Sequence, residues 1–250
     1  MTNFMRISWV ALTILVVAGC NQKAPDTAAP GNGLQTASTD PKLNGGNNVP
    51  QAINKPAEQG MDLSKIPAEL KGDAFEYYGL GRTEPIKMTV TQGGKSDPAT
   101  QTVKLTKVEG GSAEFAIADD GGLAALGEVV VSLDKNGIKV VSVNGQKADT
   151  ETFELPNGLN KGKSWPFKME TGDLKVTGTN VVSGTESVKT DVGTYKDALL
   201  VVTTGTGQQG GQKVQFKSKQ WLVKGRGQVK TEISRVSGKT TQIVTMSESK

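Results

Sequence analysis

From Met61 onward, the sequence is a succession of short segments in which apolar and polar residues alternate, separated by turns rich in glycine and asparagine. Such alternation is typical of β-strands that bury one face. The connections are too short for the helical crossovers that parallel strands need, so neighbouring strands should pair antiparallel. The pattern therefore predicts an all-β domain with a minor helix over residues 61–250.

Several turns can be located from the residues that they require. Asp134-Lys135-Asn136-Gly137 separates two apolar alternating segments and predicts a hairpin, because Asn-Gly accepts positive φ. Asn144-Gly145 predicts a second hairpin turn of the same kind, and Pro156-Asn157-Gly158 ends a short strand. Before the strands, residues 66–72 contain enough helix-forming residues for one helical turn with a glycine stop.

Two motifs in the domain resemble ligand sites, and both have a structural interpretation. Gly205–Gly210 matches G-x-G-x-x-G, but a helix should follow this dinucleotide fingerprint, and an alternating strand follows instead. We interpret it as a hairpin loop. Asp119-Asp120 is followed by two glycines and could supply oxygen ligands to calcium, but a solvated turn is the favoured interpretation.

Composition excludes several classes of function. The chain has no histidine, which rules out Ser-His-Asp and Cys-His nucleophile systems and histidine ligation of zinc or haem. The net charge of +4 is small and reads as dispersed, so nucleic acid is not an expected partner. We predict no catalytic residue, no metal and no cofactor.

Residues 20–60 differ sharply from the domain that follows. Residues 21–60 contain five prolines and no aromatic residue, and most of their other residues are small or polar. Such a segment cannot bury enough apolar surface to offset its chain entropy. It is predicted to be a disordered linker between residues 1–19 and the β-domain.

Residues 1–20 resemble the signal and lipobox of bacterial lipoprotein precursors. Arg6 precedes an apolar run, and the small residues Ala18 and Gly19 precede Cys20, the only cysteine in the chain. The resemblance implies cleavage between Gly19 and Cys20, followed by attachment of diacylglycerol and an acyl chain to Cys20. It implies a lipid-anchored protein of the cell envelope. Because Asn21 replaces the aspartate retention signal, a diderm host would place it in the outer membrane, facing the periplasm or the cell surface.

Three C-terminal segments are similar to uncharacterised envelope lipoproteins with a W-x3-G-x-G-x-V-K signature. They are residues 155–165, which end in Gly162-Lys163-Ser164-Trp165, then Val192–Ala198, and then Trp221–Lys230. The resemblance implies a curved antiparallel sheet, half-barrel or clam-like in shape, as in the LolA and LolB lipoprotein carriers. It supplies an expected fold and compartment but no chemistry.

We therefore expect a non-enzymatic binding or structural module that holds an apolar ligand, a glycan or another envelope protein. Trp165, Tyr195 and Trp221 are the candidate binding face, and packing within the sheet is the other interpretation of these residues. The alternative function is a carboxylate-dependent hydrolase of cell-wall glycan. That chemistry needs two acids facing each other about 5–10 Å apart, which the sequence cannot pair.

Overall fold

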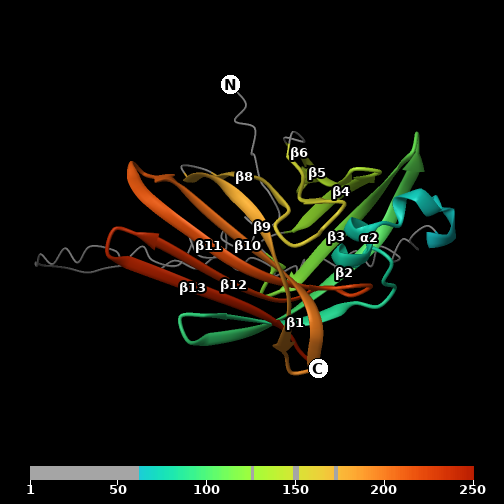
Figure 1. The fold of residues 1–250 in the computed structure, drawn as a ribbon. Helices are drawn as coiled ribbons and strands as arrows, with labels where there is room; N and C mark the ends of the chain where they lie inside the picture. The colour runs from blue at the N-terminus through green and yellow to red at the C-terminus, as the bar shows by residue number, and fades with distance from the viewer. Residues whose placement is uncertain (1–61, 125–126, 149–151, 172–173) are drawn as a thin grey trace, which may run out of the picture.

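The computed structural model describes residues 62–124, 127–148, 152–171 and 174–250. In this described part, thirteen strands form one antiparallel sheet with two free edges (Figure 1). The strands are β1 (Ile86–Gln92), β2 (Lys95–Glu109), β3 (Ser112–Gly121), β4 (Glu128–Asp134), β5 (Gly137–Val143), β6 (Gln146–Lys147), β7 (Leu155–Pro156), β8 (Ser164–Thr171), β9 (Leu174–Lys189), β10 (Thr194–Gln209), β11 (Gln212–Val223), β12 (Gly227–Ser237) and β13 (Thr240–Glu248). The helical segments are η2 (Leu63–Lys65), η3 (Ala68–Leu70) and α2 (Asp73–Tyr78). The predicted all-β, mostly antiparallel class is confirmed.

The chain enters the sheet at its middle and fills it in two passes. Strands β1 to β6 run outward to one edge, and β8 to β13 return from the other edge until β13 pairs with β1. In the closing pair, Val90 lies opposite Met246. The predicted hairpin at Asp134–Gly137 is confirmed: the Asp134 carboxylate accepts hydrogen bonds from the backbone N–H groups of Asn136 and Gly137. Asn144 begins the second predicted turn with φ of 49°.

One face of the sheet, which we call the inner face, carries the main apolar core. Val214, Phe216 and Leu222 of β11 lie in this core together with Ile233 and Val244 of the next two strands. The residues between them point to the opposite, outer face, because successive side chains of a strand alternate. The inner face also packs against α2, which contacts β5 and β7 from one half of the sheet and β11 and β12 from the other.

The short helix α2 depends on residues that are distant in the sequence. Its N-cap, Gly72, has no side chain to cap the helix, and the Asn157 side chain accepts the hydrogen bond of the Ala74 N–H instead, at 2.8 Å. Asn157 belongs to the predicted turn after β7, so this turn caps the helix. At its other end, Gly79 adopts the left-handed conformation that stops a helix.

A line of glycines lets the sheet bend between β8 and β11. Phe167, Gly178, Gly205 and Phe216 form one cross-strand row. Three strand spacings of a flat sheet would separate the two phenylalanines by about 14 Å, yet their rings stack with centroids 5.3 Å apart. A Cβ on Gly178 would overlap the Thr204 carbonyl oxygen, so this bend needs glycine.

The expected loop at Gly205–Gly210 is wrong. Strand β10 continues to Gln209, and only the turn at its end is a loop.

Candidate functional site

The structure places the three aromatic residues of the predicted binding face in two separate clusters. Trp165 lies in the main core and is 6% exposed. Trp221 belongs to a second, smaller cluster with Val188, Leu200 and Val229, and Tyr195 packs against this cluster. The structure therefore does not bring the three aromatic rings together.

Trp221 is surrounded by its own chain. Its indole Nε1 donates a hydrogen bond to the Glu186 carboxylate at 2.7 Å, and the Nζ atoms of Lys230 and Lys219 lie 5.1 and 6.0 Å from its ring centroid. The ring is 5% exposed. Packing within the sheet, the other interpretation offered by the sequence, describes this environment.

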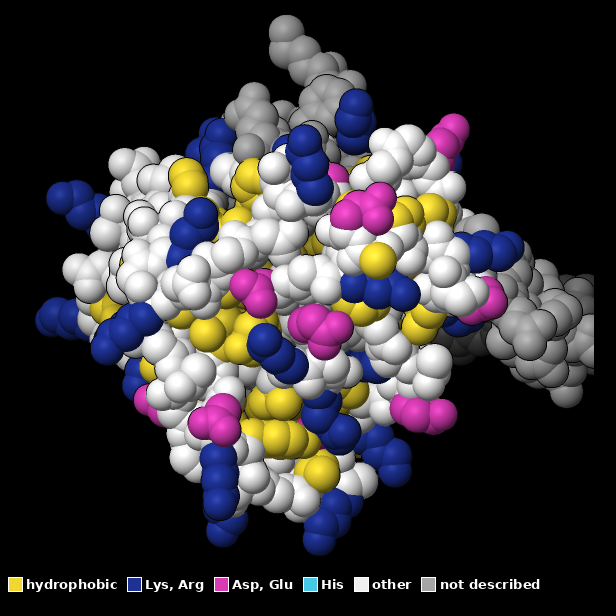
Figure 2. All heavy atoms as spheres, turned by 45° about the vertical axis from the view of Figure 1, so that its right-hand side comes forward, with side chains coloured by type: hydrophobic (Ala, Val, Ile, Leu, Met, Phe, Trp, Pro, Cys, Tyr) yellow, Lys and Arg dark blue, Asp and Glu magenta, His cyan; other side chains and the backbone are white. Residues whose placement is uncertain are grey.

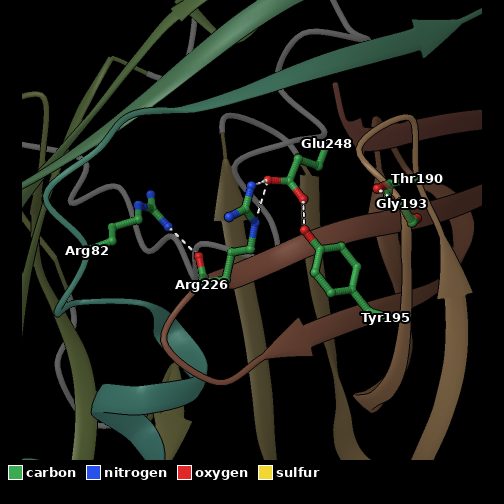
Figure 3. A network of polar contacts seen from close by, with 6 residues as sticks. All are labelled: Arg82, Thr190, Gly193, Tyr195, Arg226 and Glu248. Atoms are coloured by element: carbon green, nitrogen blue, oxygen red, sulfur yellow. Dashed lines mark hydrogen bonds and ion pairs between the residues drawn. The ribbon is translucent and has the colours of Figure 1, made fainter. Parts of the chain in front are cut away.

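A polar cluster ties three distant turns to the end of β13 (Figure 3). The Glu248 side chain is 1% exposed and accepts hydrogen bonds from the Tyr195 hydroxyl and from Arg226 Nε, both at 2.6 Å. Arg226 Nη2 donates to the same carboxylate oxygen. Beyond them, Arg82 donates to the Arg226 carbonyl oxygen at 3.0 Å, and the Asp191 N–H donates to the Glu248 carbonyl oxygen at 3.3 Å.

The contacts in this cluster raise the pKa values of two of its groups, Tyr195 and Arg226. Desolvation, together with the hydrogen bond that Tyr195 donates to Glu248, raises the pKa of Tyr195 to about 12. The hydrogen bond to Glu248 also raises the pKa of Arg226. Both groups keep their protons at neutral pH, so the cluster is a structural clamp between the β9–β10 turn, the β11–β12 turn and β13.

Arg82 extends the polar chain into the other half of the sheet. It donates a hydrogen bond to Gln101 of β2 at 2.6 Å, and Gln101 donates to Asp119 of β3 at 3.0 Å. Desolvation raises the pKa of Asp119 to about 6 and lowers the pKa of Arg82 to about 10. The solvated turn expected at Asp119-Asp120 is wrong, because both residues lie in β3. In the described part of the chain, no three acidic, histidine or cysteine side chains are grouped to hold a metal ion.

The inner face beneath α2 is filled by the protein's own side chains. A cavity of about 20 Å³ remains between Tyr77 and Tyr78 of α2 and Gln220 and Leu222 of β11, which is room for about one water molecule. On the face that Figure 2 shows, hydrophobic side chains form small patches among basic and acidic ones. Neither feature offers an apolar ligand an enclosed site.

A larger hollow lies where the inner face passes beyond the apolar core. Toward the β10–β11 and β12–β13 turns, the inward positions change from apolar to polar, and the resulting groove measures about 430 Å³. Arg235 lies opposite Phe216, and Gln242 lies opposite Arg235, so the groove continues the core face. Its lining residues are Gln209, Gly210, Gln212, Arg235, Ser237, Thr240 and Gln242.

Hydrogen-bonding groups dominate this groove. The Ser237 hydroxyl donates to the Gln212 amide oxygen at 3.2 Å. The Gln242 amide oxygen is buried and has no hydrogen-bond partner among the described residues. The described lining contains no carboxylate and no aromatic ring. The sequence analysis missed this site, because its three glutamines come from three different strands, β10, β11 and β13.

The lipidation and cleavage residues Cys20 and Gly19 lie outside the described residues. Among the residues that are described, the structure contains no helix with the length and apolar character needed to cross a membrane.

No known protein-family model matches the chain, and no curated protein matches it. It is similar to the solved structure of a Bacteroides fragilis protein described as exported and as having a YmcC-like fold. That alignment has 14% identity and a TM-score of 0.43, and covers 66% of this chain and 92% of the other. It is also similar to a protein described as a lipoprotein from Parabacteroides distasonis, with 11% identity, the same two coverages and a TM-score of 0.41.

Proposed function

We propose that this chain is a lipid-anchored lipoprotein of the bacterial cell envelope, and that its β-domain is a non-enzymatic binding module for a glycan. The observation that carries the binding role is the polar groove at the β10–β11 and β12–β13 turns. Sugar hydroxyls both donate and accept hydrogen bonds, and amide, hydroxyl and guanidinium groups supply matching partners. The groove volume of about 430 Å³ is within the range of small-ligand sites.

The geometry favours a polar ligand over an apolar one. Helix α2 packs on the inner face at β5, β7, β11 and β12, and the cavity beneath it measures about 20 Å³. An acyl chain would need far more space than this cavity, and in the polar groove it would leave amide, hydroxyl and guanidinium groups without hydrogen-bond partners. A ligand with hydroxyl groups would match these donors and acceptors.

Binding without hydrolysis follows from the groove's chemistry. Glycoside hydrolysis with two carboxylates requires acids on both sides of the bond to be cleaved. The described groove lining has none, while Glu248 and Asp119 are held in the polar chain of Figure 3 and its extension. The groove therefore supports recognition, and the hydrolase alternative gains no support from it.

The location is proposed from the lipobox, with Cys20 carrying the acyl chains. One acyl chain holds a protein only marginally, whereas two or more hold it stably. In a diderm host, Asn21 favours the outer membrane, with the domain facing the periplasm or the cell surface. A Cys20→Ser precursor should lose palmitate labelling and membrane fractionation while its domain still folds. Membrane fractionation equal to that of the wild type would contradict the anchor.

The groove is tested with Gln212→Ala/Gln242→Ala in the mature chain. The matched control is Gln208→Ala/Gln215→Ala, which removes two amides from outward positions of β10 and β11. Binding of chitooligosaccharides and of soluble muropeptides is measured by calorimetry. We expect the groove variant to weaken binding by about tenfold, because two hydrogen bonds contribute about 0.5–1.5 kcal/mol each. Absence of binding by the wild type, or equal losses in both variants, would refute the glycan site.

A further inference from the structure

The outer face of β8 to β11 concentrates positive charge. Four cross-strand rows cover this part of the sheet, and five of their sixteen side chains are lysines, whereas one is a carboxylate. The rows are Glu170, Lys175, Gln208, Lys213; then Lys168, Thr177, Thr206, Gln215; then Pro166, Thr179, Thr204, Lys217; and Ser164, Val181, Val202, Lys219. We call this surface the lysine face. The small net charge of the chain had suggested dispersed lysines, but the pairing of β8 to β11 places five of them on one surface.

The lysines are close enough to act together. Lys213 and Lys217 are four residues apart on one strand, which is about 13 Å, and Lys175 lies two strands from Lys213, about 10 Å away. Both separations exceed the Debye length of about 8 Å at physiological ionic strength, so the lysines repel one another little, and each adds its own attraction to an anionic surface. On the next strand, Lys230 and Glu232 pair at 2.9 Å, so that strand adds no net charge here.

An exposed apolar side chain adjoins the lysine face. Lys217 lies opposite Ser234, and Ser234 lies opposite Ile243 of β13. Ile243 is 60% exposed. Among the described residues, it is one of two large hydrophobic side chains that are exposed. Basic side chains beside an exposed aliphatic group are a combination that binds anionic membrane surfaces, through charge and through shallow burial.

We infer that the lysine face, together with Ile243, docks the domain on a bilayer that contains anionic phospholipid. The occupant follows from charge complementarity and from the exposed isoleucine, which a soluble polyanion would leave in water. The glycan groove opens on the inner face, so docking by the outer face leaves the groove turned away from the bilayer. The inference rests on the proposed function only in that the lipid anchor brings the domain to a membrane.

The test removes the anchor so that the face acts alone. The mature full chain with Cys20→Ser is mixed with vesicles of phosphatidylcholine containing phosphatidylglycerol, and binding is measured by co-sedimentation. Lys213→Gln/Lys217→Gln should weaken vesicle binding by about thirtyfold, since each lysine near an anionic surface contributes about fivefold. The control Lys135→Gln/Lys147→Gln removes the same charge near the opposite edge of the sheet and should bind as the wild type does.

The outcomes separate this proposal from the glycan site. Binding that is absent from pure phosphatidylcholine vesicles, that is lost in about 1 M salt, where the Debye length is about 3 Å, and that is weakened by Ile243→Ser supports the docking face. Equal losses in the two lysine pairs, or no binding to anionic vesicles, overturn it. Lysine-dependent binding to soluble polyphosphate without vesicle binding also overturns it. Glycan binding by the Lys213→Gln/Lys217→Gln chain is expected to stay unchanged in every case.

Discussion

Replacing Asp119 by asparagine tests whether its buried carboxylate lowers the free energy of unfolding. Asp119 belongs to the polar chain between the two halves of the sheet. The Asp119 side chain is partly buried in β3 and accepts one hydrogen bond from Gln101, while its second carboxylate oxygen is buried without a hydrogen-bond partner among the described residues. Arg82 lowers its pKa, but desolvation outweighs both favourable interactions and raises the pKa to about 6. An asparagine keeps the acceptor for Gln101 and removes the buried charge.

The sign of the effect follows from proton linkage. The folded pKa lies above the ordinary value of 3.8, so between these two pH values folded Asp119 keeps a proton that the unfolded chain has lost. Stability therefore falls as the pH rises through this window, by at most about 1.4 kcal/mol per pH unit, and levels off above it. The full difference is about 3 kcal/mol. Because the side chain is partly exposed, we expect Asp119→Asn to raise the free energy of unfolding by about 1–3 kcal/mol at pH 7.

Urea unfolding followed by tryptophan fluorescence measures this effect, because Trp165 and Trp221 are both buried. The difference between variant and wild type should be small at pH 4 and should grow up to pH 7. Asp120→Asn is the matched control: it removes the same charge from the next residue, which is exposed on the other face of β3. An Asp119→Asn chain that is less stable than the wild type at pH 7, or whose advantage does not grow with pH, would refute the reasoning.

Three further predictions, one with a control variant, concern other parts of the fold and are tested by urea unfolding. Gly178→Ala should destabilise the protein by about 1–3 kcal/mol, because its Cβ would meet the backbone of β10, whereas Gly193→Ala has open space and should change stability by less than about 0.5 kcal/mol. Glu248→Gln should cost about 1–3 kcal/mol and, in an ultraviolet titration, should lower the pKa of Tyr195 from about 12 toward 10; an unchanged Tyr195 pKa would contradict the clamp. Trp221→Phe should cost about 1–2 kcal/mol through the lost indole hydrogen bond and ring area, and a neutral result would show that the second cluster contributes little.

Local chemistry made some of this structure predictable. The turn at Asp134–Gly137 and the positive φ of Asn144 follow from side chains within a few residues. The pairing of β1 with β13 cannot be predicted in this way, because nothing in the sequence distinguishes Val90 and Met246 from other apolar strand residues. The burial of Asp119 escaped prediction for the same reason, since its environment comes from Gln101 on another strand and from Arg82 after α2.

The separation of the aromatic residues was within reach of the sequence. In β11, the core residues Val214, Phe216 and Leu222 occupy even positions, whereas Trp221 occupies an odd one. Alternation alone therefore places Trp221 on the face opposite the core. Trp165 is in phase with the core residues of β8, so it belongs to the inner face. Alternation cannot predict which residues bury Trp221. These include Glu186 and the residues of the second cluster that lie on β9 and β10.

Because of the same alternation, strand β11 contributes side chains both to the lysine face and to the groove. Odd positions of β11 carry Lys213, Lys217 and Lys219, while its even positions run from Leu222 in the core to Gln212 in the groove. A slip of one residue in its pairing would exchange the two faces, burying three charges and exposing the apolar set. Exposure of the apolar set and burial of those charges both oppose such a slip, so the register that forms the groove also places the lysines on the outer face. One strand register thus determines the position of both sites, and their ligands bind independently to opposite faces.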